Sequence, residues 1–118
     1  MRALNQFPEI YLHRLPVDGR KQINGLAAMV QMGMGLDPFS DALFVFTTRR
    51  YDYLKLLYWN KSGFALWMYR LEQEKFRWPK KWEGDTVTLS LDQLNWLLEG
   101  YDIMKMKPHS TLNYSSIS

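Results

Sequence analysis

The sequence predicts an α+β domain in which about five strands form a mostly antiparallel sheet with two helices. Apolar runs of strand length follow one another with short polar turns between them, which favours hairpins over β-α-β crossovers. Two segments carry apolar residues at helical spacing. The 118 residues match the size of one domain. The predicted element order is β-α-β-β-β-(β)-β-α.

The first half of the chain supplies a strand at residues 10–12 and then a helix. Asp18 is the predicted N-cap of this helix, because its carboxylate can accept hydrogen bonds from the free amides of the first turn. Apolar residues recur at helical spacing through Leu26 and Val30. Gly33 and Gly35 are predicted to end the helix, since glycine readily adopts the left-handed conformation.

The centre of the chain is predicted to hold the core of the sheet. Residues 43–48 are apolar on both faces, which indicates a central strand covered on both sides. Residues 53–59 and 64–71 then form a predicted hairpin around the turn Asn60-Lys61-Ser62-Gly63. Both faces of the second hairpin strand are also largely apolar. We therefore expect this strand to be buried, and we expect Trp59 and Trp67 to belong to the core.

The last third of the chain is predicted to complete the sheet and add the second helix. Residues 73–78 are a possible short strand stopped by Pro79, and residues 86–89 are the last strand. Ser90 and Gln93 have the spacing of a capping box, which predicts a helix beginning there and closed by Gly100. We expect one domain over residues 1–104 and a disordered, Ser-rich tail over residues 105–118.

The composition excludes several kinds of chemistry. The chain has no cysteine, which rules out disulfides, catalytic thiols and Cys-ligated zinc. No signal peptide or long apolar segment is present, so we expect a cytoplasmic protein without a membrane partner. Of the two histidines, His13 and His109, neither has an evident nucleophile beside it. Both are predicted to be exposed or locally hydrogen-bonded.

The acidic residues do not predict a metal centre. Asp37, Asp41 and Asp52 fall in loops and turns, and no pair of acids is clearly directed inward along a strand. A two-metal nuclease needs several carboxylates converging on its ions. No glycine-rich phosphate loop precedes a helix either. We therefore expect no catalytic residue, no metal and no cofactor.

Charge is distributed unevenly along the chain. Residues 61–82 carry six basic and two acidic side chains, whereas residues 83–102 carry five acidic and no basic ones. Lys and Arg supply phosphate contacts to nucleic acids, and aromatic side chains such as Trp78 and Trp82 can stack on unpaired bases. The alternative is that these cations only solvate exposed turns. The predicted DNA-binding surface consists of Arg20, Lys21, Arg49, Arg50, Lys55, Arg70, Arg77, Lys80 and Lys81.

Several short motifs occur in an order that resembles a known family. They are Val17-Asp18-Gly19-Arg20-Lys21, Leu36-Asp37-Pro38-Phe39-Ser40 followed by Leu43-Phe44-Val45-Phe46, Lys55-Leu56-Leu57-Tyr58-Trp59, and Phe76-Arg77-Trp78-Pro79. Over roughly residues 9–101 the chain resembles TnpB, the small accessory protein encoded by the second open reading frame of the insertion-sequence family numbered sixty-six. Tyr69, Gln22 and Gly19 depart from that pattern, where lysine, glycine and methionine are more usual.

The resemblance implies a protein that is encoded beside a transposase and assists transposition. In this family a separate, larger transposase cuts the DNA, which agrees with the missing carboxylate cluster. We therefore expect a non-enzymatic accessory factor that binds DNA, the transposase or both. The acidic helix at residues 91–100 would remain free for a protein partner or for self-association.

Three alternatives stay open from the sequence. The first is a protein-interaction module that docks on the transposase without touching DNA. A cryptic nuclease is the second alternative, for which Asp52 would be the residue to test. A free strand edge could also pair two copies into a homodimer.

Overall fold

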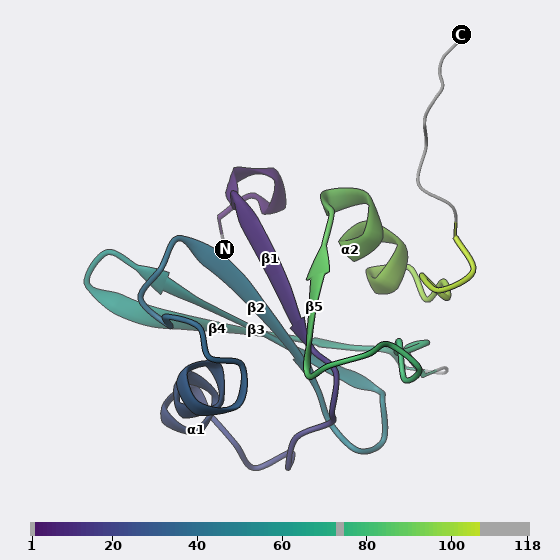
Figure 1. Cartoon of the computed structure of the whole chain (residues 1–118), viewed down its shortest axis with the longest axis horizontal. Coiled ribbons are helices and arrows are strands. Elements are labelled where there is room, and N and C mark those ends of the chain that lie inside the picture. The colour runs from purple at the N-terminus through teal and green to yellow at the C-terminus, as the bar shows by residue number, and fades with distance from the viewer. Residues whose placement is uncertain (1, 73–74, 107–118) are drawn as a thin grey trace, which may run out of the picture.

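A five-stranded sheet with a helix on each side forms the body of the molecule (Figure 1). The computed structural model describes residues 2–72 and 75–106. The strands are ordered β4-β3-β2-β1-β5 across the sheet. The elements are η1 (Leu4–Gln6), β1 (Glu9–His13), α1 (Ile23–Ala28), η2 (Met29–Gly33), β2 (Ala42–Thr47), β3 (Tyr53–Asn60), β4 (Gly63–Arg70), β5 (Thr86–Leu89) and α2 (Leu91–Leu98).

The α+β class and the mostly antiparallel sheet are confirmed, with one exception. Strands β1 and β2 pair in parallel, with Ile10 opposite Leu43, so residues 14–41 form a β-α-β crossover through α1. The prediction that the sheet has no such crossover was therefore wrong. Parallel pairing needs a connection of a dozen residues or more. Among consecutive strands that pair with each other, only β1 and β2 are joined through a helix.

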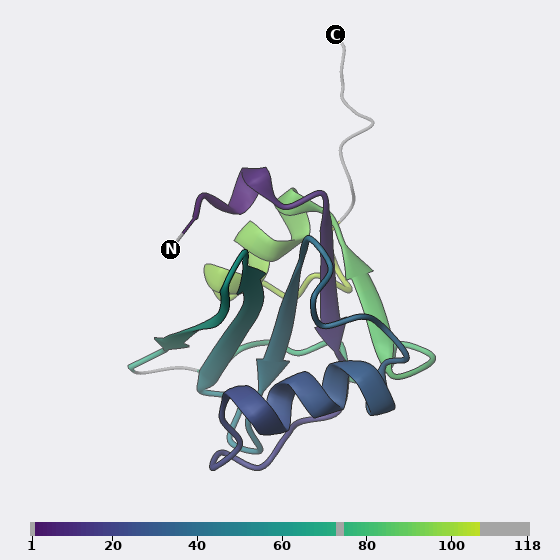
Figure 2. The ribbon, with the colours of Figure 1, turned by 90° about the vertical axis from the view of Figure 1, so that its left-hand side faces the viewer.

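Two apolar clusters fill the two faces of the sheet. Alternate residues of a strand point to opposite faces. Leu12, Val45 and Leu56 pack with Leu94 and Leu97 of α2, while Phe44, Phe46 and Leu57 pack with Leu26 and Val30 of α1 and η2. Figures 1 and 2 show α1 and α2 on opposite sides of the sheet. All six residues of β2 are buried, which confirms that it is a central strand.

Helix α1 begins later than predicted. Its N-cap is Gln22, which makes no side-chain capping bond. Asp18 instead accepts the backbone N–H of Arg20 at 2.9 Å, so it stabilises a turn in the loop before the helix. The helix then widens into the π-helical turn η2, and Gly35 follows in the left-handed conformation with a φ of 65°.

The β3–β4 hairpin has the predicted turn but a different burial. Asn60 pairs with Gly63, and Lys61 occupies the left-handed conformation with a φ of 58°. Strand β4 lies at the edge of the sheet, and its second half is exposed, with Trp67 at 43% of its maximum. The prediction of a buried strand was wrong because apolar residues on both faces do not reveal whether a strand has a neighbour on both sides.

The C-terminal elements largely follow the sequence pattern. Ser90 caps α2 and exchanges hydrogen bonds with Gln93, which confirms the capping box. Residues 75–78 are not a strand, and residues 73–74 of that predicted segment lie outside the described residues. Phe76 and Trp78 nevertheless face inward and join the core on the α2 side. Most of the predicted tail, from residue 107, also lies outside the described residues.

Candidate nucleic-acid interface

Strand pairing gathers the basic turns at one end of the sheet. Because β1 and β2 are parallel, both end there, at His13 and Thr47. The antiparallel partners place the starts of β3 and β5 and the end of β4 at the same end. The loops that leave this end carry seven of the nine predicted DNA-binding residues, and Arg70 is the last residue of β4. We call this region the basic end.

Contacts between the loops hold the basic end together. The backbone N–H of Phe76 donates to the carbonyl of Tyr51 at 2.6 Å. The Lys80 ammonium lies 4.2 Å from the centre of the Tyr51 ring, a cation–π contact. Arg14 donates to the Lys80 carbonyl at 3.4 Å. The turn between β2 and β3 is therefore packed against the segment that holds Arg77, Lys80 and Lys81.

Most of the predicted cations are exposed at this end, and some of them are already paired. Arg20 forms an ion pair with Asp18 at 2.8 Å, and Arg70 forms one with Glu72 at 2.6 Å. Lys21 is half-buried. Of the nine predicted residues, the exposed ones that form no ion pair with any described residue are Arg49, Arg50, Arg77, Lys80 and Lys81.

Lys55 differs from the other predicted residues because it lies inside the protein. Only 1% of the residue is exposed. Its ammonium donates to the carbonyls of Gly19 at 2.8 Å and Lys21 at 2.6 Å, which attaches the loop before α1 to β3. Burial lowers the pKa of Lys55, and the charge of Asp18 opposes that shift. The structure therefore does not place Lys55 on the outer basic surface.

The sequence did contain a signal for this position. Lys55 is two residues from both Tyr53 and Leu57 along a strand. Residues two apart point to the same face, so Lys55 shares a face with the apolar Leu57. A lysine on an inward face must bury its charge and find hydrogen-bond acceptors. The prediction grouped Lys55 with the exposed cations of the turns and did not take into account which face of the strand it occupies.

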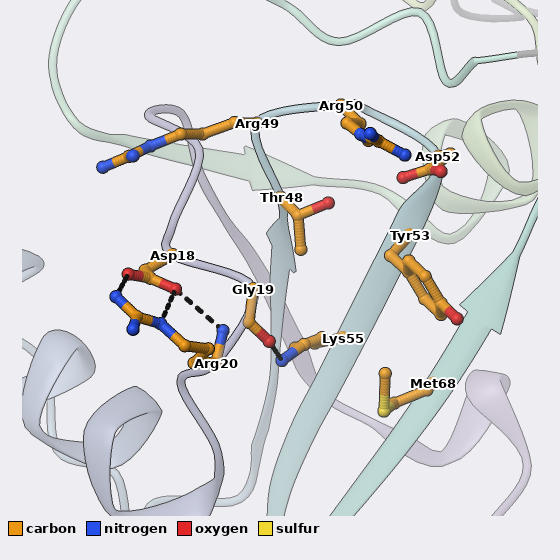
Figure 3. A pocket seen from close by; sticks show the side chains of 10 residues that line it. All are labelled: Asp18, Gly19, Arg20, Thr48, Arg49, Arg50, Asp52, Tyr53, Lys55 and Met68. Atoms are coloured by element: carbon orange, nitrogen blue, oxygen red, sulfur yellow. Dashed lines mark hydrogen bonds and ion pairs between the residues drawn. The ribbon is translucent and has the colours of Figure 1, made fainter.

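An open cleft of about 590 Å³ lies between the loop before α1, the β2–β3 turn and the β3–β4 hairpin (Figure 3). Lys55 reaches across its floor to Gly19, and Tyr53 and Met68 form the opposite wall. Arg50 and Asp52 stand at the rim, whereas Arg49 points away from the centre. The lining residues are Asp18, Gly19, Arg20, Thr48, Arg49, Arg50, Asp52, Tyr53, Lys55 and Met68.

The acidic side of the cleft is dominated by the Asp18–Arg20 pair. The Arg20 guanidinium donates two hydrogen bonds to the Asp18 carboxylate, at 2.8 and 3.1 Å. The side-chain and backbone hydrogen bonds from Arg20 hold the pKa of Asp18 well below its ordinary value, and the charge of Arg49 acts in the same direction. Asp18 is therefore ionised and committed to Arg20 at neutral pH.

Two of the tryptophans do not occupy the predicted places. Trp78, predicted to stack on bases, is 5% exposed, and its indole N–H donates to the Arg14 carbonyl at 2.6 Å. Trp82 is 39% exposed and remains accessible for stacking. Trp67, predicted to be core, is exposed together with Met68 and Tyr69 on β4. For Trp67 the difference comes from the edge position of β4, which the sequence does not indicate.

The acidic and histidine side chains of residues 2–72 and 75–106 do not gather into a metal-binding group. Within these ranges no group of three or more His, Asp or Glu side chains is placed to hold a metal ion. His13 is buried and locally bonded, with Nδ1 2.7 Å from the Leu15 carbonyl, while His109 lies outside the described residues. In the described part of the chain, no helix is long and apolar enough to cross a membrane.

Comparison with known proteins places the chain in a family. The model of the family described as "IS66 Orf2 like protein" matches residues 8–108. Two similar proteins, both from Sinorhizobium fredii, are the uncharacterized proteins y4jC and y4hO. The first is 36% identical over 78% of this chain and 78% of its own length, and the second is 36% identical over 72% and 73%. No solved structure matches significantly. The chain therefore belongs to the IS66 Orf2-like family, the accessory proteins of transposition in that insertion-sequence family.

Proposed function

We propose that this protein is a non-enzymatic accessory factor that binds DNA phosphates through its basic end during transposition. The supporting observation concerns five cations that are exposed, lack ion-pair partners among the described residues and lie in loops at the same end of the sheet. They are Arg49, Arg50, Arg77, Lys80 and Lys81. Cations in this state attract the DNA backbone and release its condensed counterions on binding. In this role the protein acts in the cytoplasm.

The predicted residues contribute unequally in this proposal. Arg20 and Arg70 must leave or share a carboxylate before they contact a phosphate, so they contribute less. Lys55 contributes nothing to the outer surface because its ammonium is bonded to two carbonyls. Trp82, exposed beside Lys81, is the aromatic side chain best placed to stack on an unpaired base.

Salt titration of DNA binding tests the proposal directly. The affinity of the full chain for duplex and single-stranded DNA is measured over a range of salt concentrations. For duplex DNA, each phosphate contact contributes about 0.9 to the slope of log affinity against log salt. We expect the double variant Arg77→Gln/Lys81→Gln to flatten this slope by about 2 units.

Lys61 provides the matched control. It is an exposed lysine in the β3–β4 turn, at the opposite end of the hairpin from the basic end. Lys61→Gln removes one positive charge, where the double variant removes two, and should leave the slope unchanged. If the chain binds neither form of DNA at low salt, the DNA-binding proposal is wrong. If Lys61→Gln flattens the slope as much per charge as Arg77→Gln/Lys81→Gln does, the binding surface is not at the basic end.

A second candidate function is docking on the transposase without DNA contact. The observation in its favour is the free edge of β4, where Trp67, Met68 and Tyr69 are all exposed. Strand edges with exposed apolar side chains are places where another chain can pair or pack. The same edge could join two copies of this chain, and the exposed acids Asp92 of α2 and Glu99, which directly follows α2, offer a separate polar surface.

Co-purification distinguishes this candidate from DNA binding. Retention of the transposase after nuclease treatment, together with its loss in a Trp67→Glu variant, would favour the docking function. Retention only while DNA is intact would favour the DNA-binding function. Light scattering of the purified chain, with and without the Trp67→Glu substitution, reports whether β4 instead mediates a homodimer.

A further inference from the structure

The cleft at the basic end contains two buried polar groups whose hydrogen-bonding capacity is not fully used. The Lys55 ammonium has three N–H groups, and the structure gives acceptors for two of them, the carbonyls of Gly19 and Lys21. No carboxylate forms an ion pair with it among the described residues. A buried cation without a countercharge is costly, so an anion in the cleft would stabilise it.

The second group is the hydroxyl of Thr48. The residue is only 8% exposed and lines the cleft. Its side-chain oxygen makes no hydrogen bond with any described residue, although its neighbour Thr47 donates to the Tyr53 carbonyl at 2.8 Å. In Figure 3 the Thr48 hydroxyl is directed into the space in front of Tyr53, away from Gly19. Buried hydroxyls normally have a partner, so this one is available to a ligand in the cleft.

Charge and shape define the kind of ligand. The lining holds four cationic side chains and two carboxylates, and Asp18 is already neutralised by Arg20. Lys55, Thr48 and Arg50 supply N–H and O–H donors to the lining of the cleft, and such donors suit the oxygens of an anion. The other wall, Tyr53 and Met68, offers a ring and a thioether to an apolar or planar group. The volume of about 590 Å³ is in the range of small-ligand sites.

We propose that this cleft binds one phosphate group of a DNA strand, with Lys55, Thr48 and Arg50 donating to its oxygens and the adjoining nucleoside lying against Tyr53 and Met68. The inference rests on the proposed DNA-binding function but adds a defined site to it. The phosphate belongs either to a strand end, as a monoester, or to the backbone of an unpaired strand, as a diester. Asp52 at the rim limits how much negative charge can enter.

The test is a nuclear magnetic resonance titration of the ¹⁵N-labelled full chain at low salt. The probes are a short oligothymidylate with a 5′-phosphate, the same oligothymidylate without it, and inorganic phosphate. We expect the amides of Gly19, Thr48 and Tyr53 to shift and saturate with the oligonucleotides. A stronger response to the phosphorylated probe identifies a strand end, and an equal response identifies a backbone phosphate.

Two variants and two controls make the result specific. Thr48→Val preserves the shape of the side chain and removes only the hydroxyl, while Lys55→Met removes the ammonium. Each should weaken binding at the cleft about tenfold, the effect of losing a hydrogen bond to a charged group. Thr88→Val, at an exposed position of β5, and Lys61→Met should leave it unchanged. If Lys55→Met does not fold, Thr48→Val alone carries the test.

The outcomes separate this inference from the function on which it rests. If DNA shifts only the amides of Arg77 to Lys81 and Thr48→Val binds normally, the cleft site is wrong and the DNA-binding proposal stands. If inorganic phosphate occupies the cleft and neither oligonucleotide does, the ligand assignment is wrong. If no oligonucleotide shifts any amide, both proposals fail.

Discussion

The floor and the rim of the cleft use basic residues in opposite ways. At the floor, Lys55 is 1% exposed and donates to two backbone carbonyls, so it holds the loop before α1 against the sheet. At the rim, Arg49 and Arg50 are exposed and form no ion pair with a described residue. The comparison shows that the role of a cation in this protein follows from its burial rather than from its sequence neighbourhood.

The physical difference lies in what each charge interacts with. A buried ammonium must be solvated by protein groups, and its removal leaves those groups without donors. An exposed guanidinium is solvated by water, so it contributes little to stability and remains accessible to a phosphate. Substitution of Lys55 should therefore lower stability, whereas substitution of the rim arginines should weaken DNA binding with little change in stability.

The largest expected effect is on the stability of the fold. Lys55→Met keeps the apolar stem but leaves the Gly19 and Lys21 carbonyls without their donor. We expect the free energy of unfolding to fall by about 2 kcal/mol, since each lost hydrogen bond costs roughly 1 kcal/mol and removing the buried charge offsets any further loss. Urea denaturation monitored by tryptophan fluorescence measures this change.

Lys61→Met is the control, and it should change the free energy of unfolding by less than about 0.5 kcal/mol because Lys61 is exposed. Equal stabilities of Lys55→Met and wild type would show that the floor is not structural, which would end the contrast with the rim.

The second prediction concerns the rim. The double variant Arg49→Gln/Arg50→Gln should bind duplex DNA about tenfold more weakly at low salt, which corresponds to about 1.4 kcal/mol. Its free energy of unfolding should stay within about 0.5 kcal/mol of the wild-type value. Fluorescence anisotropy with labelled DNA measures the affinity. A variant that unfolds more easily but binds normally would reverse the roles assigned to rim and floor.

A smaller effect is expected where a cation is already paired. Arg70 contacts Glu72, so Arg70→Gln should weaken DNA binding by less than about threefold. Glu72→Gln is the informative partner variant, because it frees Arg70 and removes a negative charge. We expect it to tighten binding by about two- to threefold in the same anisotropy assay. Weaker binding of Glu72→Gln would show that Arg70 needs its carboxylate for orientation.

The smallest effect is a dependence of stability on pH that comes from Lys55. Its pKa in the folded protein lies below the ordinary value of 10.5, because burial disfavours the charged form. Between these two pKa values the unfolded state binds more protons, so this group makes the protein more stable as pH rises toward 10.5. The difference in unfolding free energy between wild type and Lys55→Met should increase over that range. A constant difference would mean that Lys55 titrates alike in both states.

Much of the fold followed from local patterns. The apolar pattern around Phe44 predicted a central strand, and the strand-turn-strand pattern around Lys61 predicted the hairpin. Ser90 and Gln93 predicted the start of α2 because a capping box depends only on residues three apart. The N-cap at Asp18 was wrong because its carboxylate stabilises a turn instead. Such turns and N-caps use the same residue types.

The candidate interface was predictable only in part. The turn cations Arg49, Arg50, Lys80 and Lys81 were expected to be exposed, and they are. Their approach to one another depends on the parallel pairing of β1 with β2, which brings the ends of both strands together. Thr48 and Met68 had no signal at all, because a hydroxyl or a thioether becomes part of a cleft only when distant segments surround it.

The sequence by itself determined the α+β class, the strand and helix segments, the family and the supply of cations. Each of these depends on residues close together in the chain or on motifs in a fixed order. Only the tertiary structure decided that β4 is a free edge, that Trp78 is buried and Trp67 exposed, and that Lys55 lies at the floor of a cleft. Burial is set by neighbours far away in sequence, so the same residue type becomes core, rim or floor according to which strands pair.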